Sequence, residues 1–220
     1  MMGNEDRWYL ERKRMVDSLI AEGYLSKPEV IEAMLKVPRH EFIPEPHRVM
    51  AYADHPIAIG HGQTISAPHM VAMMTELLEV GRNDKILEVG AGSGYQAAIL
   101  AEIAKDGKII TLERIPELAE FARNNLERLG YKNVEVICKE GSTGYREEAP
   151  YDKIIVTAAA PDIPKSLFEQ LANNGIMLIP VGGKLLQTLK RVRKKDNEPI
   201  IENICGCVFV PLIGEEGWKS

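Results

Sequence analysis

The stretch that decides the fold is Ile86-Leu87-Glu88-Val89-Gly90-Ala91-Gly92-Ser93-Gly94-Tyr95. It begins inside an apolar run, Lys85 to Val89, which is typical of a buried strand. The alternating glycines then predict a tight turn, and a helix is expected from Tyr95 to about Lys105. Such a turn leaves backbone amides free to meet a ligand. We therefore expect a cofactor at the glycines and the acidic residue before them, namely Gly90, Gly92, Gly94 and Glu88.

The spacing of these glycines separates two classes of cofactor. Dinucleotide-binding turns read GxGxxG, whereas this turn reads GxGxG, which favours S-adenosylmethionine over NAD. A second strand, Lys108 to Leu112, precedes Glu113 at the carboxyl edge of the sheet, where a carboxylate can accept hydrogen bonds from ribose hydroxyls. We place Glu113 and its neighbour Arg114 at the cofactor. An ordinary surface position for Glu113 is the alternative.

The rest of the chain predicts an α/β fold with a doubly wound, mainly parallel sheet, because apolar runs alternate with helical patterns. Further strands are expected at 134–138, 153–157 and 176–181, and helices at 116–130 and 164–172. The last two strand-like runs, 185–192 and 200–210, should form a C-terminal antiparallel hairpin. Its basic run, 190–195, is interpreted as a solvated edge that resists strand addition, with an anionic partner as the alternative.

The amino-terminal region predicts a helical appendage. Asp6 can cap a first helix that ends at Gly23, and Ser26 with Glu29 forms a capping-box pattern before a second helix. Five prolines from 38 to 68 exclude a long regular element there. We expect one domain of residues 1–220, in which 1–67 is the appendage and 68–220 the core.

Composition limits the partners of the 220-residue chain. It has 27 Lys and Arg against 32 Asp and Glu, a net charge of −5, so no basic footprint for nucleic acid is expected. No apolar run is long enough for a membrane helix, and the amino terminus lacks the apolar core of a signal peptide. Three cysteines without a CxxC pair predict neither a disulfide framework nor a metal site. We expect a cytoplasmic monomer.

Several motifs together resemble the protein-L-isoaspartate O-methyltransferase family, repair enzymes that use S-adenosylmethionine. Gly62-Gln63-Thr64-Ile65-Ser66-Ala67-Pro68-His69-Met70 distinguishes this family from other methyltransferases, and further similar segments are 149–152, 157–161, 175–182 and 208–212. The resemblance implies a Rossmann-like fold and methyl transfer to the free carboxylate of L-isoaspartyl residues in damaged peptides and proteins, with S-adenosylhomocysteine as product. The methyl ester would then close to a succinimide, whose hydrolysis returns some normal aspartate.

The resemblance also implies how the site is arranged. Residues 63–66 and His69 would form the wall between cofactor and substrate. It assigns Gln63, Thr64, Ile65 and His69 to the cofactor, and Ile65, Ser66, Ala159, Val210 and Leu212 to the substrate. After the third strand, a carboxylate and backbone amides can meet an adenine edge, which places Glu140 and Gly141 there. The family usually has Asp-Gly at this point, so the side chain of Glu140 is one methylene longer.

Ser66 supports two interpretations that are compatible. By position it is an N-cap, since Ala67 and Pro68 follow and open a helix. A hydroxyl at a helix amino terminus, beside free amides, is also a natural receptor for a carboxylate. A carboxylate nucleophile has a pKa of about 4 and needs no general base, so we expect Ser66, as the catalytic residue, to orient it. Without the family resemblance, His69 would be interpreted as a surface residue in the first turn of this helix.

Three other functions remain as alternatives. A methyltransferase for a small molecule or RNA would keep the glycine turn but has no reason to carry residues 62–70. An NAD-dependent oxidoreductase needs the absent GxGxxG. A non-catalytic cofactor-binding module would tolerate loss of Ser66. Methylation of an isoaspartyl peptide by the purified protein discriminates among all of them.

Overall fold

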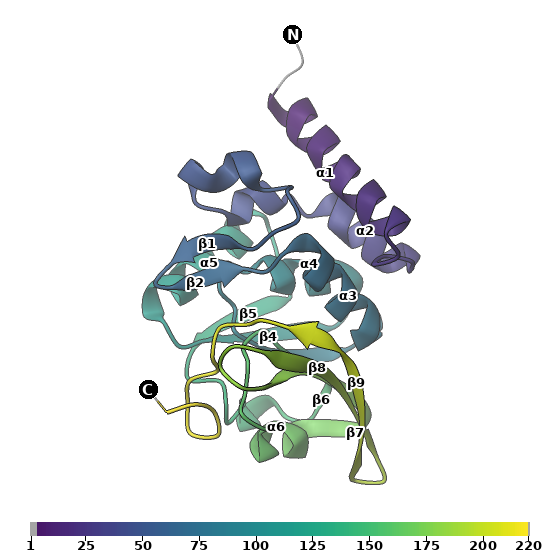
Figure 1. Ribbon diagram of the computed structural model, residues 1–220, viewed down its shortest axis with the longest axis vertical. Helices are drawn as coiled ribbons and strands as arrows, with labels where there is room; N and C mark the ends of the chain where they lie inside the picture. The colour runs from purple at the N-terminus through teal and green to yellow at the C-terminus, as the bar shows by residue number, and fades with distance from the viewer. Residues whose placement is uncertain (1–3, 220) are drawn as a thin grey trace.

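The computed structural model describes residues 4–219 and is built around a seven-stranded sheet, in the order β5-β4-β3-β6-β7-β8-β9 (Figure 1). The parallel strands are β5 (Val134–Cys138), β4 (Lys108–Glu113), β3 (Lys85–Val89), β6 (Tyr151–Val156) and β7 (Leu171–Gly182). Two antiparallel strands follow, β8 (Gln187–Lys195) and β9 (Glu198–Cys207). The predicted mainly parallel sheet with a C-terminal hairpin is confirmed.

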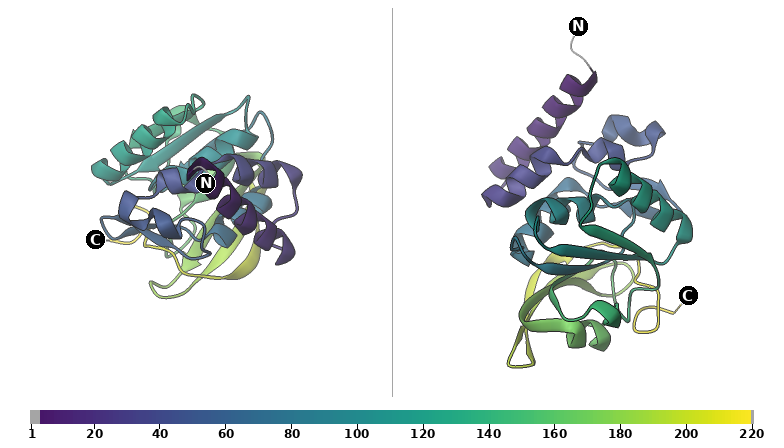
Figure 2. Two further views of the ribbon diagram at one scale, coloured as in Figure 1. Left: turned by 90° about the horizontal axis from the view of Figure 1, so that it is seen from above. Right: turned by 180° about the vertical axis from the view of Figure 1, so that it is seen from behind.

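Helices cover both faces of the sheet. Successive strand residues point to opposite sides, so an apolar strand has side chains to bury on each face. One face packs against α3 (Pro68–Leu78), α4 (Tyr95–Ile103) and α5 (Pro116–Arg128), and the other against α6 (Lys165–Gln170). In the view from behind, α5 lies along β4 and β5 (Figure 2). Within β3, Ile86 is buried on the first face and Leu87 on the second. Burial on both faces explains why these strands are continuous apolar runs in the sequence.

The strand order reverses next to β3, with β4 and β5 on one side and β6 on the other. In doubly wound folds such a switch leaves a crevice at the carboxyl ends of the strands, and ligands bind there. The glycine-rich turn follows β3 directly, so the topology places it in this crevice.

The amino-terminal segment packs on one end of the core (Figure 1). It begins with two helices, α1 (Asn4–Ala21) and α2 (Pro28–Lys36). Two 3-10 helices, η1 (Arg39–Phe42) and η2 (Glu45–Met50), follow, and then a hairpin of β1 (Ile57–Gly60) and β2 (Gln63–Ile65). Elsewhere in the chain, a third 3-10 helix, η3 (Arg146–Glu148), precedes β6. The predicted lack of a long element after Pro38 is confirmed. The hairpin was not predicted, because its strands have only four and three residues. No helix within residues 4–219 is long and apolar enough to cross a membrane.

Two predicted helix caps are wrong. Asp6 lies inside α1, which already includes Asn4. Ser26 and Glu29 form no capping box, because the backbone amides of Ser26 and Lys27 donate to the Glu76 carboxylate in α3 at 2.9 and 2.8 Å. The Ser26 hydroxyl donates to the same carboxylate at 2.9 Å. A distant acceptor thus replaces the local one that the sequence pattern suggested.

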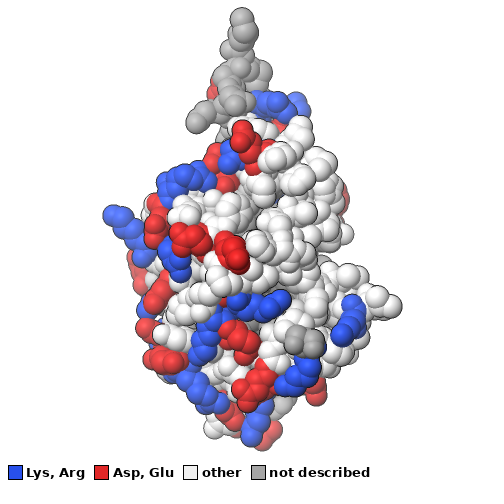
Figure 3. Space-filling model, turned by 90° about the vertical axis from the view of Figure 1, so that its left-hand side faces the viewer, with Lys and Arg blue, Asp and Glu red and all other residues white. Residues whose placement is uncertain are grey.

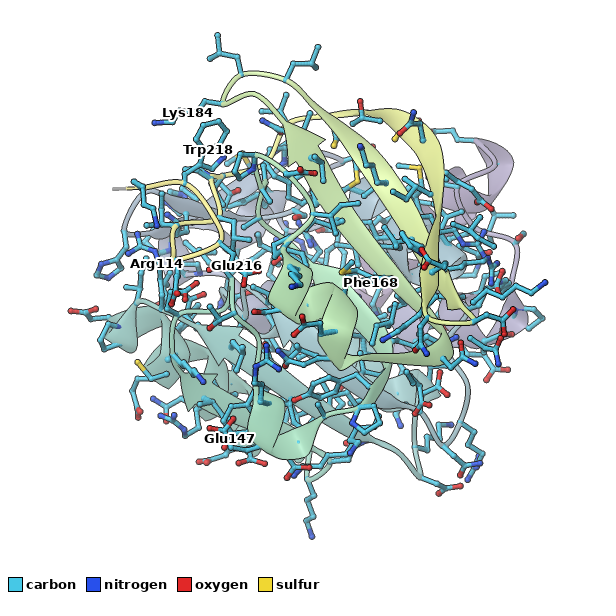
Figure 4. The ribbon with its side chains drawn as sticks, turned by 90° about the horizontal axis from the view of Figure 1, so that it is seen from below. Arg114, Glu147, Phe168, Lys184, Glu216 and Trp218 are labelled. Atoms are coloured by element: carbon cyan, nitrogen blue, oxygen red, sulfur yellow. The ribbon has the colours of Figure 1, made fainter. Side chains whose placement is uncertain are left out.

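The interpretation of the basic run as a sheet edge is also wrong, since β8 pairs with β7 on one side and β9 on the other. Arg191 and Arg193 form ion pairs with Glu79. Lys194 lies 5.0 Å from the ring centroid of Phe168, labelled in Figure 4, and donates to the Phe168 and Leu171 carbonyls at 3.2 and 2.8 Å. These cations join β8 to α3 and α6.

The Glu76 contact gives a stability prediction. Glu76→Ala leaves the amides of Ser26 and Lys27 without their acceptor, so the free energy of unfolding should fall by about 1 to 3 kcal/mol. Glu29→Ala is the matched control and should cost about 0.5 kcal/mol or less, as for other surface substitutions. Urea unfolding of both variants measures the difference. Equal losses would contradict this account of the start of α2.

Candidate active site

The glycine turn after β3 adopts backbone conformations that side chains disfavour. Gly90, Gly92 and Gly94 have φ values of 101°, 54° and 88°, all in the left-handed region. A Cβ atom on Gly90 would lie 2.4 Å from the Thr157 hydroxyl oxygen, so this position admits only glycine. Gly94 is the N-cap of α4, and a Cβ there would lie 3.1 Å from Leu126 in α5. Gly94 therefore shapes the turn and its packing.

Three cavities meet beside this turn. The turn cavity is lined by Ile65, Ser66, Glu88, Gly92 and Tyr95, among others. The sheet-edge cavity is lined by Gln63, Glu113, Arg114, Gly141 and Leu212, among others. The outer cavity is lined by Ser66, His69, Met70, Val208 and Val210, among others. Thr64 and Thr157 line all three, so the cavities form one branched site.

Glu88 is a fully buried carboxyl group at the turn cavity. Its Oε2 accepts a hydrogen bond from the Thr111 hydroxyl at 2.5 Å, whereas its Oε1 has no partner within residues 4–219. Burial raises the pKa of Glu88 from 4.5 to about 8. A buried acceptor without a donor indicates room for the donor group of a ligand.

Glu113 is held in place by two backbone amides. Its Oε2 accepts from the Gly92 amide and its Oε1 from the Ile115 amide, each at 3.0 Å. Each oxygen can accept a second hydrogen bond, and the residue lines the sheet-edge cavity. Arg114 is exposed at the rim of the same cavity, on the side of the molecule where the C-terminal residues Glu216 and Trp218 lie (Figure 4).

The structure separates Glu140 from Gly141. The Glu140 carboxylate accepts a hydrogen bond from the Ser142 amide and is not among the residues that line the sheet-edge cavity. Gly141 and Lys139 do line it. A Cβ on Gly141 would lie 2.5 Å from Val89 Cγ1, so glycine allows close packing of this loop onto β3. The backbone here, more than the acidic side chain, faces the cavity.

Ser66 is half-buried between the turn cavity and the outer cavity, but the N-cap of α3 is Ala67. The prediction that Ser66 caps this helix is therefore wrong by one residue. Fewer backbone amides are free beside Ser66 than the sequence suggested. Pro68 has no backbone N–H, and the His69 amide donates to Asp54 at 2.9 Å. The hydroxyl of Ser66 is the feature that remains available to a ligand.

His69 is fixed by the same carboxylate. Its Nδ1 lies 2.9 Å from Asp54 Oδ2, and its ring centroid lies 5.3 Å from that of Tyr24. It lines the outer cavity. Gln63, in contrast, lines the sheet-edge cavity, so these two predicted cofactor residues lie in different branches.

The C-terminal segment after β9 lies across the 157–161 turn. Ala159 donates from its amide to the Val210 carbonyl at 2.7 Å and accepts from the Leu212 amide at 2.8 Å. Ala159 is buried and lines none of the three cavities. Val210 lines both the sheet-edge and the outer cavity, and Leu212 the former. Ala159 thus supports these two residues from behind.

Sequence reasoning did not assign four residues that build the site, Arg39, Asp54, Lys139 and Thr157. The Thr157 hydroxyl donates to the carbonyls of Gly90 at 2.7 Å and Val89 at 3.1 Å, which closes the turn. Its place at the end of a predicted strand was a usable signal. Nothing in the sequence links Asp54 to His69, which is 15 residues further on.

Charge on the face shown in Figure 3 is mixed. Lys and Arg alternate with Asp and Glu over part of it, and much of the rest carries no charged side chain. Within residues 4–219, no group of three or more His, Cys, Asp or Glu is placed to hold a metal ion.

The buried Glu88 gives a pH prediction. Between pH 4.5 and about 8 the folded protein keeps the proton that the unfolded chain loses, so the free energy of unfolding should fall as pH rises through this window. Glu88→Gln keeps the shape without the titration, so its stability relative to wild type should grow by at least about 1 kcal/mol from pH 5 to pH 8. Chemical unfolding across this range tests it. Parallel pH curves for wild type and Glu88→Gln would contradict it, and the exposed Glu127→Gln serves as control.

Comparisons with known proteins point to one family. The family model described as protein-L-isoaspartate(D-aspartate) O-methyltransferase matches residues 10–217. The protein-L-isoaspartate O-methyltransferase of Methanopyrus kandleri is 56% identical over 100% of this chain and 99% of its own length. Protein-L-isoaspartate O-methyltransferase 2 of Archaeoglobus fulgidus is 57% identical over 96% of each chain.

Solved structures of similar fold point to the same family. A Plasmodium falciparum chain assigned as a protein-L-isoaspartate O-methyltransferase, in complex with S-adenosyl-L-homocysteine, has a TM-score of 0.82 and 32% identity over 92% of this chain and 98% of that chain. Another protein-L-isoaspartate O-methyltransferase has a TM-score of 0.86 and 28% identity over 94% of this chain and 67% of that chain. Because the sequence match spans almost the whole chain and the fold is shared, this chain belongs to the protein-L-isoaspartate(D-aspartate) O-methyltransferase family.

Proposed function

We propose that this chain transfers a methyl group from S-adenosylmethionine to the free carboxylate of L-isoaspartyl residues in damaged peptides and proteins, and so initiates repair through a succinimide. Family membership supports the reaction. The observation that carries it is the junction at Thr64 and Thr157, where a cavity bordered by a ribose-type acceptor, Glu113, meets an outer cavity bordered by Ser66.

The residues of the inner branches fit the cofactor. Glu113 would accept hydrogen bonds from the ribose, and the backbone at Gly141 lies where an adenine edge could approach, with Arg114 at the rim. Glu88 offers an unpaired buried acceptor in the turn cavity, which suits the ammonium group at the methionine end. When bound, S-adenosylmethionine supplies a methyl group on a positively charged sulfur.

The outer cavity fits the substrate. Its lining includes the apolar Val208 and Val210 as well as Ser66 and His69, so a peptide could lie there with its carboxylate toward the hydroxyl. The carboxylate is already ionised at neutral pH, so the chain needs no general base. Ser66 would orient it toward the inner branches, and the surrounding walls would exclude water, a proximity effect worth several kcal/mol or more.

We further propose that the chain acts as a single domain and a monomer in the cytoplasm, without a nucleic-acid or membrane partner. The main apolar core runs from Met15 in α1 to Cys207 in β9, which supports a single domain. The three cysteines are free thiols, as a reducing compartment would keep them, which supports the cytoplasm. Sedimentation velocity tests the monomer.

Ser66→Ala is the first test of the proposed site. Loss of a hydrogen bond to a charged group should lower kcat/KM for an isoaspartyl peptide by about ten- to a hundredfold. Because Ala67 is the N-cap, stability should change by only about 0.5 kcal/mol or less. Ser26→Ala is a matched control, expected to lose stability through its Glu76 contact but to keep its kcat/KM. A fully active Ser66→Ala enzyme would remove Ser66 from the reaction.

Glu113→Gln tests the cofactor branch. An amide cannot accept from both Gly92 and Ile115 while also accepting from a ribose, so affinity for S-adenosylmethionine should fall by about 1.5 to 3 kcal/mol. Calorimetric titration measures it, with the exposed Glu117→Gln as control. Unchanged affinity in a folded Glu113→Gln protein would exclude the assignment.

A further inference from the structure

Arg39, at the start of η1, is fully buried although it carries a charge. Its Nε donates to the Ala51 carbonyl at 2.8 Å, and its Nη2 donates to the Ser66 carbonyl at 2.7 Å. The guanidinium carbon lies 4.9 Å from the ring centroid of Tyr95. This one side chain therefore contacts three parts of the protein: Ala51 after η2, Ser66 between the turn cavity and the outer cavity, and Tyr95 at the start of α4.

These contacts join two walls of the turn cavity. Ser66 and Tyr95 both line it, and Arg39 lies behind them. Phe42 packs edge-on against the same Tyr95 ring at 5.6 Å, which fixes the ring under the guanidinium. The position of the Ser66 backbone relative to the glycine turn is thus set through Arg39.

Burying this cation is expensive. Within residues 4–219 it forms no ion pair, its Nη1 has no hydrogen-bond partner, and burial lowers its pKa. A buried charge held only by neutral groups costs stability that an apolar side chain would not. The cost of burying this charge points to a role for Arg39 beyond packing.

We propose that Arg39 is a positioning residue for methyl transfer, which acts by holding the Ser66 carbonyl so that the Ser66 hydroxyl points to the substrate carboxylate. The inference rests on the proposed role of Ser66. The planar guanidinium suits this task, because it can donate to two carbonyls at fixed angles and stack on an aromatic ring at once. A lysine keeps the charge but loses this fork.

Arg39→Lys is therefore the informative variant, measured alone and in combination with Ser66→Ala. We expect Arg39→Lys to lower kcat/KM for an isoaspartyl peptide about tenfold or more, since small displacements of an orienting group are costly. In the Ser66→Ala background the same change should cost less than about threefold, because the hydroxyl it positions is gone. The matched control is Arg191→Lys, a largely buried arginine in β8 that pairs with Glu79, which should keep kcat/KM.

Loss of similar size in both backgrounds, or no loss in a folded Arg39→Lys protein, would overturn the proposal. If Ser66→Ala alone retains wild-type kcat/KM, it is the proposed function of Ser66 that fails, so the two failures are distinguishable.

Wild-type protein provides a second measurement that does not need Arg39→Lys to fold. With S-adenosylhomocysteine bound, the Arg39 Nη2–Hη NMR resonance, which reports on the bond to the Ser66 carbonyl, should shift on saturation with an isoaspartyl peptide, and an unchanged resonance would overturn the proposal.

Discussion

The hydrogen bond from the Gly92 amide to the Glu113 carboxylate ties the site to the sheet. It joins the turn after β3 to the end of β4, the adjacent strand on one side of the switch point. On the other side, the Thr157 hydroxyl after β6 donates to the Gly90 carbonyl. The turn is thus fixed from both neighbouring strands, and a Cβ on Gly90 would collide with this second contact. A rigid turn between two buried strands is what allows amides and carboxylates to meet a ligand without reorganisation.

The other half of the site comes from the amino-terminal segment. Residues 38–70 contain few regular elements, so they depend on side chains for their shape. Asp54 fixes the first turn of α3 through His69, and Arg39 fixes Ser66. The small β1–β2 hairpin then presents Thr64 to all three cavities. The sheet therefore provides the core of the site, and a few polar contacts, one of them from a buried arginine, set the conformation of this loop region.

The sequence was sufficient for features that depend on local pattern. Apolar runs such as Lys85 to Val89 predicted the buried strands, and the glycine spacing predicted the turn and its cofactor class. It failed where a distant residue supplies the partner. Glu76 replaces Glu29 at the start of α2, and β9 covers a strand that looked like an edge. Such pairings are set by tertiary packing, which no local pattern encodes.

Methylation of isoaspartyl carboxylates at the branched site can be tested directly. The most direct test incubates wild-type protein and radiolabelled S-adenosylmethionine with two peptides of one sequence, one with L-isoaspartate and the other with normal L-aspartate. We expect base-labile methyl ester on the isoaspartyl peptide only, and we expect the same result for peptides with other flanking sequences. Equal labelling of both peptides, or no labelling of the isoaspartyl peptide by protein that binds the cofactor, would contradict it.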